Sequence, residues 1–370
     1  MADDDWSIDV SEDGLVVNCR FLTRPVTGVE RFAYEITARL VESVPDITLV
    51  APPDIEPGTR VRGKTVEPVG RLRGHLWEQV SLPGYLRSLG SPTLVDLANT
   101  GPLLWRKQLY TLHDVAFITH PESYRPLFRL MYRVIAGTLI RRAAHVATVS
   151  TFSRDEIIRT LRCPPDRITV VPNGVSTLGS ATARIRTPPL DGRAYFLAVG
   201  SAARHKNTAM LLDAYARFRI EQVDAPALVI VGGDSKGFRP TATADDRPGV
   251  IALGRVTDDE LAGLYANAMA FVYPSLYEGF GIPPLEAQSV GTPVIVSRRR
   301  PFTDLLQESS AVWCDPEDAA SITSALAHVS RSPELREQLI KNGSMNASRY
   351  SWDDSAKRVL AIVAGSARKG

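Results

Sequence analysis

YPSLYEGFGIPPLEAQ, residues Tyr273–Gln288, joins a strand end, a glycine-containing loop and a helix start. Pro283 and Pro284 favour the first helical turn, because proline lacks only an amide that has no partner there. The loop glycines permit unusual backbone dihedrals and bring bare amides close to a ligand. A helix N-terminus carries unpaired N–H groups and a partial positive charge, which suits a diphosphate. The stretch therefore predicts an anion site at a strand–loop–helix turn.

Two carboxylates flank this predicted anion site. Glu278 and Glu286 stand with seven residues between them. A carboxylate accepts hydrogen bonds from two neighbouring hydroxyls, so one of the pair can hold ribose hydroxyls and the other can hold sugar hydroxyls. At this spacing alone, two glutamates are typical of a protein surface. The strand, the glycines and the helix start around them favour a binding site.

The chain on either side repeats the alternation of strands and helices. In the second half we expect strands at AYFLAVG, ALVIVGG, GVIALG, AFVYPS and TPVIVS, and helices near Thr208–Ile220, Asp258–Ala266 and from Pro283. In the first half we expect strands at Leu15–Asn18 and in TLVDLA, QLYTLHD and HVATVS, and helices at Glu30–Val44 and Pro126–Ala143. Strands that alternate with helices indicate parallel sheets covered on both faces.

The length of 370 residues suggests two domains. Ser176–Arg193, STLGSATARIRTPPLDGR, lacks periodicity and is typical of a linker, with a long surface loop inside one domain as the alternative. We therefore expect an α/β protein of two facing doubly wound parallel-sheet domains, at 1–180 and 181–350. Ligands of such sheets bind outside the carboxyl ends of the strands, so we expect the active site in the cleft between the domains.

The composition is that of an ordinary globular protein, with 44% hydrophobic and 23% charged residues. Three widely spaced cysteines disfavour a disulfide framework or a structural zinc site. The acidic start MADDDWSIDVSEDG does not resemble an export signal, and no run reaches the roughly 20 apolar residues needed to span a bilayer. We therefore expect a cytoplasmic protein. The acidic run Asp3–Asp5 is typical of a disordered terminus, not of a metal site.

Positive charge is concentrated in one part of the chain. Arg60–Arg167 contains 17 Lys and Arg against 8 Asp and Glu, a net charge of +9. Such a stretch can attract anionic partners, and lipid headgroups at the inner face of the plasma membrane are the partner we consider, without nucleic acid. Arg129 and Arg133 share a predicted helix with Leu130, Val134 and Ile135. This helix either faces a membrane or packs on the core with its arginines extended into solvent.

The chain resembles the retaining GT-B glycosyltransferases of family 4 over most of its length. EGFGIPPLE resembles the Glu-x7-Glu signature of that family. CRFLTRPVTGVERFAYEI, LYTLHDVAFITHPESY, ITVVPNGV, FLAVGSAARHKN and IALGRVTDDELAGLYANA resemble its other landmarks in the same order. YSWDDSAKRVLAIV resembles the last family helix, which crosses back to the first domain, so we assign residues 351–370 to that helix. The resemblance implies two Rossmann-like domains and transfer from a nucleotide-diphosphate sugar.

The resemblance also implies roles for particular residues. Glu278 would hold the donor sugar, Lys206 would neutralise the diphosphate and His113 would face the sugar, so these three are the expected catalytic residues. The other expected donor-binding residues are Gly28 at a phosphate, Glu286 at the ribose, Gly254, Arg255 and Val256 at the base, and the loop Gly279, Phe280, Gly281 and Ile282. Ser201 stands where many relatives have arginine, and Arg204 is the candidate to supply that charge.

Simpler structural interpretations compete at three of these positions. A lone histidine is usually structural, but His113 stands at the carboxyl end of the strand LYTL, toward the expected cleft. Asp114 can orient this histidine or cap the next turn. Lys206 precedes Asn207, a candidate N-cap of the next helix, and without the resemblance it is typical of a surface lysine.

We therefore expect a hexosyltransferase of glycan, polysaccharide or glycolipid synthesis that uses neither a metal nor a cofactor. TGVERF and HDVAF resemble mannosyl and deoxyhexosyl transferases, which favours GDP-mannose and leaves UDP-hexoses open. The acceptor would be a glycan, a glycolipid or a lipid-linked sugar, selected by amino-terminal loops such as Pro68–Pro83. Two alternatives are a nucleotide-sugar epimerase of the same architecture and an inactive partner subunit that binds a nucleotide sugar.

Overall fold

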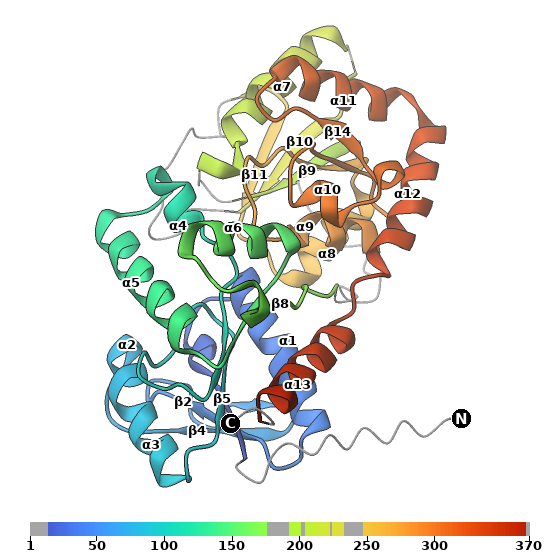
Figure 1. Cartoon of the computed structure of the whole chain (residues 1–370). Coiled ribbons are helices and arrows are strands. Elements are labelled where there is room, and N and C mark those ends of the chain that lie inside the picture. The colour runs from blue at the N-terminus through green and yellow to red at the C-terminus, as the bar shows by residue number, and fades with distance from the viewer. Residues whose placement is uncertain (1–13, 176–191, 201–203, 223, 233–246, 368–370) are drawn as a thin grey trace. The chain divides into compact units, whose positions relative to one another are not determined.

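The alternation of strands and helices forms two parallel sheets, each in a unit of its own (Figure 1). The computed structural model describes residues 14–175, 192–200, 204–222, 224–232 and 247–367. Unit 1 comprises Met1–Ile118, Leu127–Gly174 and Ser351–Gly370, and unit 2 comprises Thr119–Pro126 and Val175–Tyr350. The division thus falls at Gly174–Val175, a few residues before the expected boundary. Thr119–Pro126, expected in the amino-terminal domain, groups with unit 2. Most of the expected linker lies outside the described residues.

Unit 1 contains an eight-stranded sheet in the order β3-β4-β2-β1-β5-β6-β7-β8, parallel except for the antiparallel pair β3–β4. The strands are β1 (Leu15–Asn18), β2 (Thr48–Ala51), β3 (Arg60–Val61), β4 (Lys64–Pro68), β5 (Thr93–Asp96), β6 (Gln108–Thr111), β7 (His145–Thr148) and β8 (Ile168–Val170). In the central register, Val16 pairs with Thr48 on one side and Leu94 on the other. The central strands are buried along their whole length, as expected for a sheet covered on both faces.

The helices of unit 1 are α1 (Gly28–Ser43), α2 (Gly74–Leu76), the π-helical turn η2 (Trp77–Ser81), α3 (Leu82–Ser88), α4 (Ala116–Thr119), α5 (Pro126–Arg142), α6 (Thr151–Leu161) and α13 (Trp352–Ala367). Single 3-10 turns are η1 (Arg20–Thr23) and η4 (Pro165–Arg167). Helix α1 begins with a capping box in which Thr27 and Glu30 satisfy each other's backbone amides. Helix α13 packs against α1, where Trp352 meets Phe32 edge-on at 6.1 Å between ring centroids and Asp353 pairs with Arg39.

Unit 2 contains a six-stranded, fully parallel sheet in the order β11-β10-β9-β12-β13-β14. Its strands are β9 (Tyr195–Val199), β10 (Ala227–Val231), β11 (Val250–Gly254), β12 (Ala270–Tyr273), β13 (Val294–Ser297) and β14 (Val312–Cys314). The first three strands extend the sheet in one direction and the next three in the other. The direction therefore reverses between β9 and β12, and ligands of doubly wound sheets bind at the carboxyl ends of such a strand pair.

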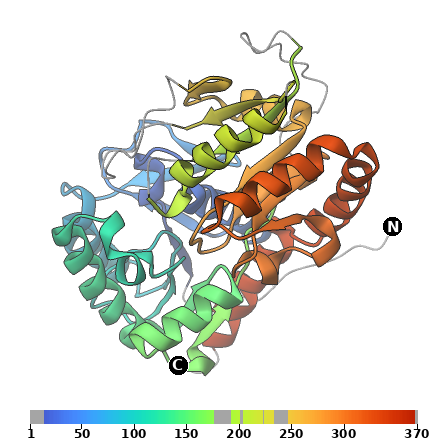
Figure 2. The same cartoon turned by 90° about the horizontal axis from the view of Figure 1, so that it is seen from above.

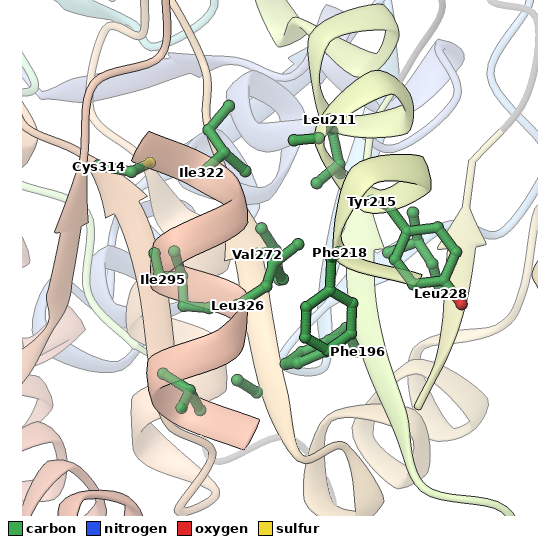
Figure 3. Packing of buried hydrophobic residues seen from close by; sticks show 14 of the residues in the cluster. Phe196, Leu211, Tyr215, Phe218, Leu228, Val272, Ile295, Cys314, Ile322 and Leu326 are labelled. Carbon is green, nitrogen blue, oxygen red and sulfur yellow. The ribbon is translucent and has the colours of Figure 1, made fainter. Parts of the chain in front are cut away.

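The helices of unit 2 are α7 (Thr208–Glu221), α8 (Asp258–Asn267), α9 (Ile282–Ser289), α10 (Phe302–Leu305), α11 (Ala319–Arg331) and α12 (Pro333–Ala347), with short turns η3 (Pro121–Ser123), η5 (Arg204–Lys206) and η6 (Glu308–Ser310). Helices α7 and α11 lie side by side on one face of the sheet (Figure 2). Between them and the sheet, Phe196 of β9, Phe218 of α7 and Leu326 of α11 are fully buried (Figure 3). This core fixes β9 and β12, the two strands that carry the site.

The predicted fold class is confirmed: both halves are α/β units around doubly wound parallel sheets. The predicted helices at Pro126–Ala143 and Thr208–Ile220 end within one residue of the observed helices, and the predicted strand Leu15–Asn18 has the observed bounds. Within the part of the chain that the structure describes, no helix is long and apolar enough to cross a bilayer.

Candidate active site

Lys206 and Glu278 form an ion pair at the reversal point of the unit 2 sheet. Lys206 ends the turn that follows β9, and Glu278 lies in the loop that follows β12. Because β9 and β12 are parallel neighbours, their carboxyl ends bring the two side chains together. The Lys206 Nζ atom lies 2.7 Å from Glu278 Oε1, and 20% and 12% of the two side chains remain exposed. A charged pair is thus held at the surface edge of the predicted ligand site.

Two buried hydroxyls complete this cluster, and sequence reasoning missed both. The Tyr273 hydroxyl donates to Glu278 Oε1 at 2.9 Å and accepts from Lys206 Nζ at 2.7 Å, and the Ser275 hydroxyl donates to Glu278 Oε1 at 2.7 Å. Tyr273 ends β12, where alternation places its side chain toward the site. Both residues belong to the motif YPS. They did not stand out in the sequence, because neither side chain is charged.

Burial and charge set the protonation states of the cluster. Burial alone raises the pKa of Glu278, but Lys206, His205 and the hydrogen bonds from Lys206 and Ser275 outweigh it, so the pKa is lowered and the carboxylate stays ionised. Burial, and then the charge of Glu278, raises the pKa of Tyr273 well above its ordinary value. Tyr273 is therefore a neutral hydrogen-bond donor to an ionised carboxylate.

Backbone contacts join the two loops that carry the ion pair. The His205 carbonyl accepts from the Leu276 amide at 2.7 Å. The Asn207 side chain donates to the carbonyls of Pro274 and Pro316 at 3.0 and 2.6 Å. Asn207 stands at the N-cap position of α7, with a left-handed backbone, but its side chain makes no capping bond. The predicted N-cap position is therefore confirmed, but in place of a capping bond the Asn207 side chain tethers the loop after β9 to the loop after β12.

Gly281 turns the donor loop into helix α9. Its φ of 105° lies in a region that favours glycine, and an added Cβ would lie 2.6 Å from the ring of Phe302. The helix then begins with Ile282, Pro283 and Pro284, and the two prolines lack amide hydrogens. The helix start therefore offers fewer N–H groups than a helix usually does. The amides of Phe280, Gly281 and Ile282, directly before the prolines, are the candidates to bind an anion.

Glu286 lies on α9, one turn into the helix, and is buried. Its Oε2 atom accepts from the Tyr265 hydroxyl at 3.4 Å. Its charge also contributes to raising the pKa of Tyr273, which places both glutamates of the Glu-x7-Glu pair near the same tyrosine.

Glycines at three adjacent strand ends lie close together. Gly200, Gly232 and Gly254 follow or end β9, β10 and β11. The Gly232 amide donates to the Gly254 carbonyl at 2.7 Å, and a Cβ added to Gly232 would lie 1.9 Å from the Gly200 carbonyl oxygen. Only bare backbone fits here. Arg255 is exposed and Val256 half-buried after β11, and Arg204 is exposed on η5, while Ser201 lies outside the described residues.

The segment Thr119–Pro126 contributes an aromatic contact to unit 2 that the sequence did not predict. The His120 ring lies 4.4 Å from the Tyr277 ring between centroids, directly before Glu278 in the donor loop. Burial lowers the pKa of His205 to about 4, and the charges that act on it include Glu278, Lys206, His120 and Glu122. A segment from the first half of the chain therefore lies beside the loop that carries Glu278.

The remaining predicted residues, His113 and Gly28, lie in unit 1. His113 follows β6 and is 5% exposed, its Nε2 atom lies 2.9 Å from the Leu97 carbonyl, and Phe32 meets its ring edge-on at 4.9 Å. Because a carbonyl only accepts, Nε2 carries the proton. Burial lowers the pKa of His113 to about 4, so the ring is neutral at pH 7. Asp114 accepts from the Ala116 amide at 2.9 Å and thus caps the turn of α4. Gly28 is the exposed first residue of α1.

Unit 1 also holds a buried polar cluster at its own strand reversal, between β1 and β5. Glu78 Oε1 accepts from Arg20 Nε and from the Thr100 hydroxyl, each at 2.8 Å. Asn18 donates to Asp96 Oδ1 at 2.8 Å, and burial raises the pKa of Asp96 well above its ordinary value. A cavity of about 10 Å³ opens onto this cluster and is also lined by Arg24. Sequence analysis did not single out these residues, because they come from four separate segments.

Within the described residues, no group of three or more His, Cys, Asp or Glu side chains is arranged to hold a metal ion. The cationic groups at the unit 2 site are those of Lys206 and the nearby Arg204 on η5.

Comparisons with known proteins identify the family of the chain. Residues 26–177 match the sequence profile of Glycosyltransferase Family 4, and residues 181–345 match that of Glycosyl transferases group 1. The chain is 31% identical to an O-antigen chain mannosyltransferase of Salmonella typhimurium over 78% of this chain and 79% of the relative. It is 29% identical to a GDP-mannose:cellobiosyl-diphosphopolyprenol alpha-mannosyltransferase of Komagataeibacter xylinus, over 70% and 65% of the two chains.

Similarity to solved structures extends over almost the whole fold. Anabaena HepE in complex with UDP-glucose superposes with a TM-score of 0.71 at 14% identity, covering 94% of this chain and 99% of the other. At this identity the likeness shows the fold alone, which is GT-B. With both family profiles and the mannosyltransferase relative matched along the sequence, the chain belongs to the group 1, family 4 glycosyltransferases.

Proposed function

We propose that the chain is a hexosyltransferase that moves a mannose-like sugar from a nucleotide-diphosphate sugar to an acceptor hydroxyl, with retention at the anomeric carbon. The observation that carries this proposal is the Lys206–Glu278 pair at the strand reversal of unit 2, held by Tyr273 and Ser275. It combines a cation for a diphosphate with an ionised acceptor for sugar hydroxyls in one place.

Lys206 would neutralise the diphosphate. An ammonium group has three N–H donors, and two of them are directed to Tyr273 and Glu278. The third remains for a phosphate oxygen. As the bond to the sugar breaks, negative charge grows on the leaving diphosphate, and a cation already fixed in position stabilises that charge without reorganisation. The amides of Phe280, Gly281 and Ile282 and the guanidinium of Arg204 would act on the same group.

Glu278 would hold the donor sugar, and Glu286 would hold the ribose. Because the Glu278 carboxylate is ionised, it accepts hydrogen bonds from sugar hydroxyls, and its three intramolecular donors fix it in one orientation. Glu286 lies one turn into α9, so its carboxylate stands beyond the loop amides that would bind the diphosphate. The base would lie against the bare backbone at Gly200, Gly232 and Gly254.

The proton of the acceptor hydroxyl would pass to the departing diphosphate. Tyr273 is neutral, and its hydroxyl donates a hydrogen bond to Glu278. We assign no side chain as a covalent nucleophile. His113, which we propose takes part from unit 1, has a neutral ring whose protonated Nε2 is directed to the Leu97 carbonyl. Its second nitrogen, Nδ1, is therefore an acceptor for a sugar hydroxyl.

GDP-mannose is the donor that we favour. The relatives support this choice, because one is an O-antigen chain mannosyltransferase and another is named as a GDP-mannose-dependent mannosyltransferase. The Anabaena structure contains UDP-glucose, so a UDP-hexose is the competing donor. For the acceptor we propose a lipid-linked or other glycan.

A transfer assay tests the proposal. The purified protein is incubated with GDP-mannose or UDP-hexoses and a panel of glycan and lipid-diphosphate acceptors, and the anomeric configuration of the product is determined by NMR. We expect an α-linked product from an α-linked donor, lost in Glu278→Ala, Lys206→Ala and His113→Ala variants that remain folded. An inverted product contradicts retention. Conversion of the donor without acceptor would instead indicate an epimerase, and binding without any turnover would indicate an inactive partner subunit.

A further inference from the structure

A short segment from the first half of the chain packs within unit 2. The chain belongs to unit 1 up to Ile118 and again from Leu127, and Thr119–Pro126 between them groups with unit 2. The two ends of this segment are tied together in unit 1, where the Phe117 ring lies 6.0 Å from the Tyr132 ring between centroids. The segment is therefore a short loop with a fixed base.

Local hydrogen bonds hold His120 in one conformation inside this loop. The Thr119 hydroxyl lies 3.1 Å from His120 Nδ1, and the His120 carbonyl accepts from the Ser123 amide at 3.1 Å. Pro121 begins the 3-10 turn η3, and its ring fixes the backbone φ angle there. The His120 ring is thus presented from a backbone with little conformational freedom.

The His120 ring contacts the loop that carries Glu278. Its centroid lies 4.4 Å from that of Tyr277, a buried residue directly before Glu278. An aromatic pair at this distance contributes beyond the area it buries, because the rings have preferred orientations. After burial, the charges that act on the pKa of His205, on the other loop of the ion pair, include those of His120 and Glu122. The segment therefore lies beside both loops of the candidate site.

The two carboxylate oxygens of Glu278 differ in their surroundings. Oε1 accepts hydrogen bonds from Lys206, Tyr273 and Ser275. In the described part of the chain no group bonds Oε2, and 12% of the side chain is exposed. Oε2 is therefore the oxygen left for a sugar hydroxyl. Because Oε1 is held, the direction of Oε2 depends on where the backbone after Tyr277 places the Glu278 Cα atom.

We propose that His120 is a positioning residue for the donor sugar. By packing on Tyr277, its ring fixes the backbone at Glu278 and thereby directs Oε2 toward the sugar. The inference rests on the proposed function, in which Glu278 holds the donor sugar. Other groups hold the nucleotide, so His120 should affect the sugar and not the nucleotide. A ring that only stabilised unit 2 would lower its stability and leave the kinetics of the folded enzyme unchanged.

Transfer kinetics of two His120 variants test the proposal. His120→Phe keeps a ring and loses the contact with the Thr119 hydroxyl, whereas His120→Gln keeps a hydrogen-bonding side chain and loses the ring. We expect His120→Gln to lower kcat/KM for GDP-mannose by about ten- to a hundredfold, because a small displacement of a positioning group costs this much. The Kd for GDP should change by less than about twofold. His120→Phe should retain most of kcat/KM.

Glu122→Gln is the matched control in the same segment. Glu122 is exposed, so this variant removes a charge from the segment and leaves the ring contact. It should keep the kcat/KM of the unchanged protein. Equal kcat/KM for His120→Gln and His120→Phe would overturn the proposal. So would a loss in Glu122→Gln as large as that in His120→Gln, or a parallel loss of GDP affinity in His120→Gln.

A double-mutant cycle on stability tests the ring contact itself. Unfolding of His120→Ala, Tyr277→Leu and the double variant is measured by denaturant titration of the full chain. We expect a coupling of about two- to tenfold in the unfolding equilibrium constant of unit 2. A cycle without coupling would overturn the proposal whatever sugar is transferred. Failure of the proposed function would appear separately, as absent transfer by the unchanged protein.

Discussion

At the scale of single residues, the candidate site depends on how Tyr273 connects the two charges. Its hydroxyl accepts from Lys206 and donates to Glu278, so one neutral group orients both. Without this hydroxyl, the ion pair between Lys206 and Glu278 would be held less firmly, because the Lys206 side chain is flexible and 20% exposed.

Tyr273→Phe therefore tests the cluster without changing its charge. Removing a hydrogen bond to a charged group costs about 1.5–3 kcal/mol, which corresponds to a loss of about ten- to a hundredfold in kcat/KM. We expect this loss with the donor site otherwise intact. Tyr215→Phe is the matched control, because Tyr215 is a buried tyrosine of the same unit whose hydroxyl bonds backbone carbonyls in the core. It should lower the melting temperature and leave kcat/KM unchanged. Equal kinetics in both variants would contradict the role of Tyr273.

His113 gives the fold a pH dependence at the residue scale. Its pKa falls from 6.5 in the unfolded chain to about 4 in unit 1, because burial disfavours the charged ring. The unfolded chain thus binds one more proton between these values. This stabilising term is complete above about pH 6.5 and is lost progressively as the pH falls toward 4.

Calorimetry between pH 7 and pH 4 measures this effect. We expect the melting temperature of unit 1 to fall with pH, and His113→Gln to reduce the proton uptake on unfolding by about one proton. The role of burial would be refuted by a His113→Gln variant with the full pH dependence.

At the scale of elements, the sequence predicted much because local signals agreed with the fold. The Thr27–Glu30 capping box marks the start of α1, and alternating strands and helices predicted both sheets. Glu278 and Glu286 were singled out because a strand, glycines and a helix start surround them, and Lys206 because of the family resemblance. Tyr273, Ser275 and His120 were missed because their roles depend on contacts between loops. Asn207 was correctly placed at the N-cap of α7, but its residue type does not reveal that its side chain bonds the carbonyls of Pro274 and Pro316 and not the helix.

The turn into α9 provides a prediction at this scale. Gly281→Ala forces a side chain into a left-handed backbone against the buried ring of Phe302. We expect a loss of about 1–3 kcal/mol in the stability of unit 2, together with weakened donor binding, because the loop amides move. Gly137→Ala is the control: it lies inside α5 with no atom near its added Cβ, and it should stabilise unit 1 by about 0.5–1 kcal/mol. Unchanged donor binding by a folded Gly281→Ala variant would contradict the role of the turn.

At the scale of the whole molecule, the chain leaves unit 1 at Gly174–Val175 and returns at Tyr350–Ser351. Inside unit 2, the Val175 amide donates to the Tyr350 carbonyl at 3.0 Å. Inside unit 1, a Cβ added to Gly174 would lie 2.3 Å from the Trp352 backbone nitrogen. The motif PNGV contains this glycine, but no local pattern reveals that Trp352, much later in the sequence, packs against it.

Gly174→Ala should therefore displace the start of α13 from unit 1. Val359, Leu360 and Val363 of α13 are buried there, so loosening this helix exposes apolar surface. We expect a lower melting temperature for unit 1 and an unchanged transition for unit 2 in calorimetry. Gly84→Ala, on α3 with open space around its added Cβ, should not lower it. A Gly174→Ala variant as stable as the unchanged protein would show that this close approach is not required.

The most direct test of the central claim compares how Lys206 and Glu278 contribute to binding of a nucleotide and of the corresponding nucleotide sugar. Thermal stabilisation by GDP and by GDP-mannose, with UDP and UDP-glucose in parallel, is measured for the unchanged protein and for Lys206→Gln and Glu278→Gln, since a ligand that binds only the folded state raises the melting temperature. We predict that Lys206→Gln weakens binding of the nucleotide and of its sugar alike. Glu278→Gln should weaken the nucleotide sugar and leave the nucleotide nearly unchanged. Equal stabilisation of all three proteins, or no stabilisation of the unchanged protein by any of these ligands, would contradict the assignment of the donor site.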